Sequence, residues 1–335
     1  MNTAELPMVL FTVIAQMCVG MFWVLGVVDL VLSRTRARAE VDRLTEPVVY
    51  AIGPVLVVGL VISTFHMNDV THAVNVLRHI GSSWLSREIW SGLGFAALGL
   101  VWAVLAWWRL GSYLLRRVVA ALAALVGLCL VWSMSMIYYS LVAVPAWHTA
   151  IVPVHFLSTT VLLGSLAVAA CLMVTALVRR RARETMGSAA ADDAPQRTSF
   201  MDRVRAKAMA VNAPASDEEW TATTAVVRRV MVAALCAGVL VLVSYPVHIA
   251  NLATGNATAV RSAEAFTGAF FVVRLVVLAV AAVLITVVSY QVAGSARRER
   301  PQLLAIWVSA AFVLAVVGEL MGRALHYESM FRVGI

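Results

Sequence analysis

The chain has 335 residues, of which 61% are hydrophobic and only 13% are charged, and its mean hydropathy is +0.87. A soluble domain of this length needs more polar residues to cover its surface, so this composition excludes an ordinary soluble protein. The net charge of +8 could suggest nucleic-acid binding. However, the basic residues lie in the segments between apolar blocks, which argues against that role.

Eight apolar blocks follow one another along the chain. Each is about twenty residues or more, long enough for a helix to cross about 30 Å of hydrocarbon. None has the alternation that is typical of transmembrane strands. We therefore predict an all-α integral membrane protein, with residues 1–335 forming a single domain that is a bundle of eight transmembrane helices. The predicted spans are 8–32, 48–66, 88–108, 118–138, 150–178, 225–249, 266–290 and 302–322.

The basic residues follow the positive-inside pattern of membrane proteins. Twenty of the 26 Lys and Arg lie between the first and second, third and fourth, fifth and sixth, and seventh and eighth predicted spans. Because cytoplasmic loops carry the excess of Lys and Arg, both termini are predicted to be non-cytoplasmic. The expected location is the inner (cytoplasmic) membrane, which the protein crosses several times.

Residues 179–228 are predicted to form a cytoplasmic insertion between the fifth and sixth spans. A solvated connector is the simpler interpretation, and an interfacial amphipathic helix over residues 200–211 is the alternative. Ser216 and Glu219 stand at the spacing of a capping box, which predicts the start of the next helix at this point.

Polar groups within the apolar blocks concentrate at one level of the membrane. All seven histidines lie in predicted outer loops or at outer helix ends, as do Glu88, Arg274, Glu319 and Arg323. A proton pump or a secondary transporter usually has ionisable residues near the midplane, and a cytochrome that carries electrons across the membrane needs histidine pairs at two depths. The one-sided distribution argues against these classes.

A histidine and a carboxylate at the outer interface suit the oxidation of a lipid-soluble quinol, which must lose two protons with its two electrons. His66 ends the second predicted span and Glu88 begins the third, so the loop between them can bring them together. Each also has an ordinary interpretation, His66 as an interfacial helix cap and Glu88 as an anion at a helix N-terminus. Position alone favours the ordinary interpretations.

Four stretches of the sequence resemble the membrane-anchor subunit of the dimethyl sulfoxide reductase family. The first is Glu5-Leu-Pro-Met-Val-Leu-Phe-Thr12, with Gln16 and Gly20 after it. The others follow in the same order along the sequence. They are His66 with Ala73, Asn75, Leu77, Gly81 and Trp84-Leu-Ser-Arg-Glu-Ile89; Tyr138 with Pro145-Ala-Trp147, Pro153, Phe156 and Leu162-Leu-Gly164; and Gly318-Glu-Leu-Met-Gly-Arg-Ala-Leu325 with Tyr327.

The resemblance implies an anchor subunit that oxidises menaquinol and passes electrons to an iron–sulfur subunit with [4Fe-4S] clusters. That subunit in turn supplies a catalytic subunit that carries molybdopterin. The resemblance assigns quinol binding to a histidine and an acid that match His66 and Glu88, and it implies no heme or iron–sulfur cluster in this protein. The quinol-binding residues that we expect are His66, Met67, Trp84, Arg87, Glu88, Arg274, Glu319 and Arg323.

The sequence departs from the family pattern in two places. After the histidine the family usually has Leu-Gly-x-Pro, whereas residues 67–70 read Met-Asn-Asp-Val. His148, His155 and His326 stand where other residues are expected, and surface variation is the simpler interpretation, with a proton path to water as the alternative. The alternative functions are a b-type cytochrome subunit with an outer heme and a non-redox membrane transporter or anchor.

Overall fold

The computed structural model describes residues 5–65, 76–186, 201, 204, 213, 216–293 and 301–333, and its eight long apolar helices confirm the predicted bundle. Three short helical segments, η3 (Leu77–His79), α9 (Ala257–Ala263) and η5 (Glu264–Phe266), lie between the long helices. The long helices are α1 (Leu6–Leu32), α2 (Arg38–Thr64), α4 (Trp84–Trp107), α5 (Tyr113–Tyr139), α6 (Ile151–Met186), α8 (Asp217–Ala253), α10 (Ala269–Ala293) and α11 (Pro301–Glu328).

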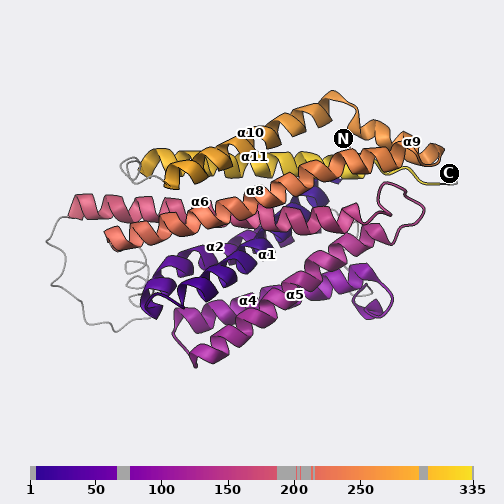
Figure 1. Ribbon diagram of the computed structural model, residues 1–335. Coiled ribbons are helices and arrows are strands. Elements are labelled where there is room, and N and C mark those ends of the chain that lie inside the picture. Colours follow the sequence, from indigo (N-terminus) through magenta and orange to yellow (C-terminus); the bar gives the residue numbers. More distant parts are fainter. Residues whose placement is uncertain are drawn as a thin grey trace.

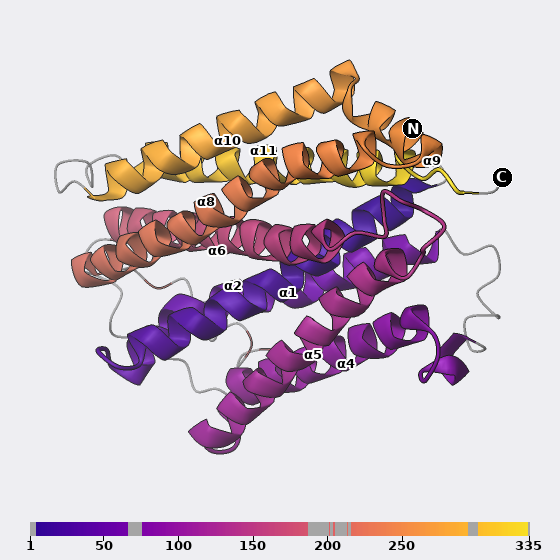
Figure 2. The ribbon, with the colours of Figure 1, turned by 45° about the vertical axis from the view of Figure 1, so that its right-hand side comes forward.

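The helices run roughly side by side, and α1 begins at the same end of the bundle at which α11 ends (Figure 1). We call this end the outer end and the opposite one the inner end, following the orientation that the charge pattern predicts. Helix α6 lies near the centre and packs against α1, α8 and α11, whereas α4 and α5 form a hairpin at one side (Figure 2). Helices α1 and α6 are the most buried of the eight, and α4 is the least buried.

Two glycines let α1 and α6 come into backbone contact. A Cβ atom on Gly20 would overlap the carbonyl oxygen of Thr160, and one on Gly164 would overlap the backbone of Gly20. Small residues are used in this way where membrane helices pack closely, because van der Waals contact is the main force between them in lipid. This contact joins the first helix of the bundle to the central one.

Several helices extend beyond their predicted ends on the inner side, and α2 shows the reason most clearly. It begins at Arg38, ten residues before the predicted start at residue 48. Its first turns carry Asp42 and Glu46, whose carboxylates bind Arg109 from the turn between α4 and α5, with 3.1 Å between Glu46 and Arg109. Arg38 also binds Asp42 at 2.9 Å. A search for apolar blocks finds only the part in hydrocarbon and misses these paired turns.

The ends of the predicted insertion at residues 179–228 are helical, because α6 continues to Met186 and α8 begins at Asp217. The hydroxyl of Ser216 accepts a hydrogen bond from the backbone N–H of Glu219 at 3.1 Å, which confirms the predicted helix start. The carboxylate of Glu219 instead binds Arg43, at 2.8 Å, and Arg179. Most of the interfacial helix considered for residues 200–211 lies outside the described residues.

Candidate functional site

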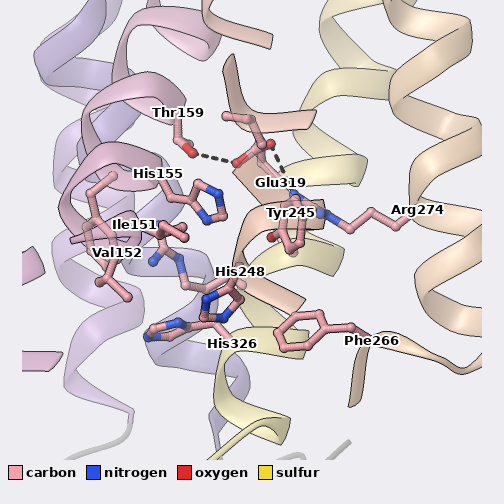
Figure 3. A pocket seen from close by; sticks show the side chains of 14 residues that line it. Ile151, Val152, His155, Thr159, Tyr245, His248, Phe266, Arg274, Glu319 and His326 are labelled. Atoms are coloured by element: carbon pink, nitrogen blue, oxygen red, sulfur yellow. Dashed lines mark hydrogen bonds and ion pairs between the residues drawn. The ribbon is translucent and has the colours of Figure 1, made fainter. Parts of the chain in front are cut away.

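A small polar cavity lies between the outer ends of α6, α8, α10 and α11 (Figure 3). Its volume is about 30 Å³. Four helices that are far apart in sequence each contribute polar side chains, so the cavity is a product of the tertiary fold. The polar residues that line it are His155, Thr159, Tyr245, His248, Arg274, Glu319, Arg323 and His326.

An ion pair between Arg274 of α10 and Glu319 of α11 forms one wall of the cavity (Figure 3). The charged groups are 3.6 Å apart, and their side chains are only 1% and 6% exposed. The hydroxyl of Thr159 donates a hydrogen bond to Glu319 at 2.6 Å, and the Arg274 guanidinium lies 4.5 Å from the centre of the Tyr245 ring. Charged side chains inside a membrane are usually paired, because an unpaired charge is energetically costly there.

Glycines on α11 make room for the Arg274 side chain. Its Nε donates a hydrogen bond to the carbonyl oxygen of Gly318 at 2.9 Å. A Cβ atom on Gly322 would stand 2.5 Å from the guanidinium, so a larger residue there would displace it. The Gly-Glu-Leu-Met-Gly sequence at residues 318–322 thus supplies both the carboxylate and the space for its partner.

Arg323, one turn after Glu319, is held by the two central helices. It donates a hydrogen bond to the side-chain oxygen of Gln16 on α1 at 2.8 Å, and Gln16 donates one to the carbonyl oxygen of Phe156 at 3.1 Å. The guanidinium also lies 3.8 Å from the centre of the Phe156 ring. The fully buried Gln16 therefore links α1, α6 and α11 in one polar network.

Two of the three unexpected histidines are wrongly interpreted as surface variation. His155 lines the cavity, bonds to the hydroxyl of Ser244 and lies 4.8 Å from the Tyr245 ring. His326 also lines it and stacks on Trp147 with 5.1 Å between the ring centres. His148 is exposed, as expected, with its ring 2.7 Å from the carbonyl oxygen of Tyr139.

Some polar atoms of the cavity residues have no hydrogen-bond partner in the part of the protein that the structure describes. They are Nη1 of Arg274, Oε1 of Glu319, Nε of Arg323 and Nε2 of His326. A cavity of about 30 Å³ has room for about two water molecules, which would satisfy such groups. It is far smaller than a quinol ring. The expected contact of Arg274, Glu319 and Arg323 with quinol therefore stays a prediction, and it would require the cavity to widen.

Glu88 lies in the first turns of α4, which begins after Ser83; the Ser83 hydroxyl accepts a hydrogen bond from the N–H of Ser86. Glu88 is only 5% exposed, although α4 is the least buried of the eight long helices. Within the described segments it has no hydrogen-bond or ion-pair partner, but its charge is within electrostatic range of Tyr138 and Tyr327. The other proposed members of this site, His66 and Met67, lie outside the described residues.

Arg87 and Trp84 stand beside Glu88 and shape the turn before α4. The Arg87 guanidinium lies 4.2 Å from the centre of the Trp84 ring and donates hydrogen bonds to the carbonyl oxygens of Ile80 and Gly81, at 2.9 and 2.7 Å. These contacts hold the turn after η3 against the start of α4. Neither residue lines the cavity between α6, α8, α10 and α11.

An aromatic cluster, formed by Tyr138, Trp147, His326 and Tyr327, connects the two groups of predicted site residues. The hydroxyls of Tyr138 and Tyr327 are 2.5 Å apart, and the Tyr138 ring centre lies 4.7 Å from that of His326 and 5.0 Å from that of Trp147. His326 lines the cavity. Both tyrosines are within electrostatic range of Arg323, which also lines the cavity, and of Glu88.

Sequence reasoning missed Thr159 and Tyr245 as members of this region. Helical spacing of polar residues at the outer ends of the spans could have indicated Thr159. His155 and Thr159 stand four residues apart, and so do Glu319 and Arg323, which puts each pair on one helix face. Among the described residues, no group of three or more His, Cys, Asp or Glu side chains is arranged to hold a metal ion.

The comparisons with known proteins identify one family and three curated relatives. The family model "DMSO reductase anchor subunit (DmsC)" matches residues 1–188. The match includes Glu88 and His155 but ends before α8, so it does not include Arg274, Glu319 or Arg323.

The curated relatives are subunits of anaerobic dimethyl sulfoxide reductases. The C subunit of the Escherichia coli (strain K12) enzyme is 32% identical over 162 residues, which is 48% of this protein and 55% of the relative. The C subunit from Haemophilus influenzae is 32% identical over 52% of this protein and 61% of the relative. The YnfH subunit of Escherichia coli is 30% identical over 50% and 57%. The similarity therefore spans little more than half the length of these relatives. Because the family model covers more than half of the sequence, the protein belongs to the DMSO reductase anchor subunit family.

Proposed function

We propose that this protein oxidises quinol, with menaquinol as the expected form, at the outer end of the bundle. The electrons pass to an iron–sulfur subunit of a molybdopterin oxidoreductase complex, with this protein as its membrane anchor. Membership of the anchor family and the eight apolar helices support the anchor role. They also favour it over a b-type cytochrome subunit and over a non-redox transporter.

The burial of Glu88 is the observation that carries the proposal. A buried carboxylate that no residue of the described segments pairs with is expensive at the edge of a membrane, so we expect it to be retained because it binds or accepts something. Glu88 lies within the part of the sequence that the family model matches. No ion pair joins Glu88 to a cation of the described segments, so in this proposal its carboxylate serves as the proton acceptor.

The proposed reaction releases two protons and two electrons from each quinol and leaves the quinone. Glu88 accepts one hydroxyl proton and His66 accepts the other, since carboxylate and imidazole groups are common proton acceptors in enzyme sites. Both protons then pass to the water at the outer end. The electrons leave one at a time for the iron–sulfur subunit on the same side, so the step moves little charge across the membrane.

Helix α4 gives a lipid-soluble substrate access to this site from the bilayer. Trp90, Leu93 and Leu100 are 48%, 48% and 67% exposed in the bundle, and they face the hydrocarbon. In this proposal Met67, Trp84 and Arg87 line the entrance beside His66 and Glu88. Arg274, Glu319 and Arg323 line the separate small cavity between α6, α8, α10 and α11, so in this proposal they act on quinol indirectly.

The test of this function uses the purified complex that contains this protein. We expect it to oxidise a menaquinol analogue and to reduce its terminal acceptor in proportion. The control is the complex stripped of this subunit, which should accept electrons from a water-soluble donor and fail with quinol. If the intact complex turns over with the soluble donor but leaves the quinol reduced, the proposal is wrong.

A further inference from the structure

A second and much larger cavity lies toward the inner end, between α1, α2, α4 and α5. Its volume is about 500 Å³, which is within the usual range of about 300–1,000 Å³ for ligand sites. The wall is almost entirely apolar, and Val27 and Leu30 on α1 are 60% and 47% exposed at its edge. Other apolar residues that line it are Phe22, Leu25, Val49, Trp102 and Ala120.

The inner rim of this cavity carries one carboxylate and three guanidinium groups among the described residues. Asp29 forms an ion pair with Arg38 at 2.8 Å, and Asp42 forms another at 2.9 Å. Arg38 also donates a hydrogen bond to the hydroxyl of Tyr113 at 3.0 Å. The carboxylate of the rim is therefore already neutralised. The two remaining guanidinium groups belong to Arg116 and Arg117 at the start of α5.

Arg116 and Arg117 have no ion pair and no hydrogen bond to another side chain within the described part of the protein. Nε of Arg116 is buried without a partner, and the Arg117 guanidinium rests 5.1 Å from the centre of the Tyr113 ring. Both residues are half-buried. Partly desolvated guanidinium groups are stabilised by an anion. Phosphate is a good partner because its oxygens can accept paired hydrogen bonds from the guanidinium N–H groups.

We propose that this cavity binds an anionic phospholipid from the inner leaflet. An acyl chain fills the apolar space beside Trp102 and Ala120, and the phosphate accepts hydrogen bonds from Arg116 and Arg117. The cytoplasmic leaflet is rich in anionic lipids, and basic pockets between helices on that side bind their headgroups. A quinone would fill the same space, but its neutral ring would leave the two positive charges uncompensated. This site is independent of the quinol site at the other end of the bundle.

The lipid would fill the space between the α4–α5 hairpin and the pair formed by α1 and α2. Within this region the hairpin is held to α1 by few direct bonds; one is the hydrogen bond from Nε1 of Trp23 to the carbonyl oxygen of Ala124, at 3.0 Å. A bound acyl chain would extend that contact along the helices. We therefore expect the lipid to stabilise the protein as well as to bind it.

The experiment measures binding of phosphatidylglycerol and its effect on the melting temperature of the detergent-purified full-length protein. Phosphatidylglycerol should bind and raise the melting temperature, whereas phosphatidylethanolamine and inorganic phosphate should do neither. The double variant R116Q/R117Q should bind phosphatidylglycerol about thirtyfold more weakly. The matched control is R34Q/R228Q, which removes two exposed inner arginines and should behave like the wild type.

A second variant tests the apolar part of the site. Ala120→Phe leaves both arginines in place and fills part of the cavity, so it should also lose the phosphatidylglycerol effect. Undiminished phosphatidylglycerol binding by both R116Q/R117Q and Ala120→Phe would overturn the proposal. So would an equal effect of phosphatidylethanolamine, of inorganic phosphate or of a menaquinone analogue on the wild type, because each would identify a different occupant.

Discussion

Replacing Glu88 by Gln is expected to slow quinol oxidation by about 10²–10⁴-fold, the usual contribution of a group that accepts a proton in the transition state. Glutamine keeps the size of the side chain and removes the basic oxygen. Because Glu88 has no ion pair in the described part of the protein, the exchange should leave the fold intact. Glu88→Asp should retain part of the activity, since it keeps a carboxylate one methylene further back.

The measurement is the rate of quinol oxidation by the assembled complex, beside the rate with a water-soluble donor that bypasses this subunit. The second rate should not change in Glu88→Gln. A matched control is Glu264→Gln, which removes an exposed carboxylate near the same end of the bundle. If Glu88→Gln and Glu264→Gln both oxidise quinol at the wild-type rate, Glu88 is not the proton acceptor.

The second large effect is expected at the Arg274–Glu319 pair. Replacing Glu319 by Ala leaves the 1%-exposed Arg274 side chain without its counter-charge and removes the acceptor of the Thr159 hydroxyl. Breaking a buried pair in this way costs about 3–5 kcal/mol. Glu319→Gln should cost less, because the amide oxygen can still accept from Thr159.

Thermal unfolding of the purified protein in detergent measures this effect. Glu328→Ala, at the exposed end of the same helix, is the control and should change stability by no more than about 0.5 kcal/mol. The double variant R274M/E319L removes both charges and should recover much of the loss, since an apolar pair of similar volume can replace a buried ion pair. Equal stability of Glu319→Ala and Glu328→Ala would show that the pair contributes nothing to the fold.

The sequence was sufficient for the number and order of the membrane helices, because hydrocarbon thickness sets a length that apolar blocks either reach or miss. It was not sufficient for their ends. Arg38, Asp42 and Glu46 look like a polar loop in sequence, yet they form the first turns of α2 because Arg109 from a distant turn neutralises the carboxylates. Whether such polar residues form helical turns depends on ion-pair partners that are remote in sequence.

The candidate site could likewise be predicted only in part from the sequence. Arg274 and Glu319 could be expected to pair because single charges are costly at that depth. The convergence of His155, Tyr245 and His326 on the same cavity depends on how α6, α8 and α11 pack, and periodicity within one helix does not contain that information. The close contact of Gly20 with Gly164 has the same origin. Each glycine alone is an ordinary membrane residue, and its importance follows from the partner helix.

The central claim is that quinol is oxidised at the outer end of the bundle. The most direct test follows protons during quinol oxidation by the complex in sealed proteoliposomes of known orientation, with a pH-sensitive dye on each side. The terminal substrate is replaced by an impermeant one-electron acceptor, such as ferricyanide, which takes the two electrons without taking up protons. We predict two protons per quinol on the side of the two termini, with little change in membrane potential from this step. Release of the protons on the side of the loops between α1 and α2 and between α4 and α5 would contradict the account.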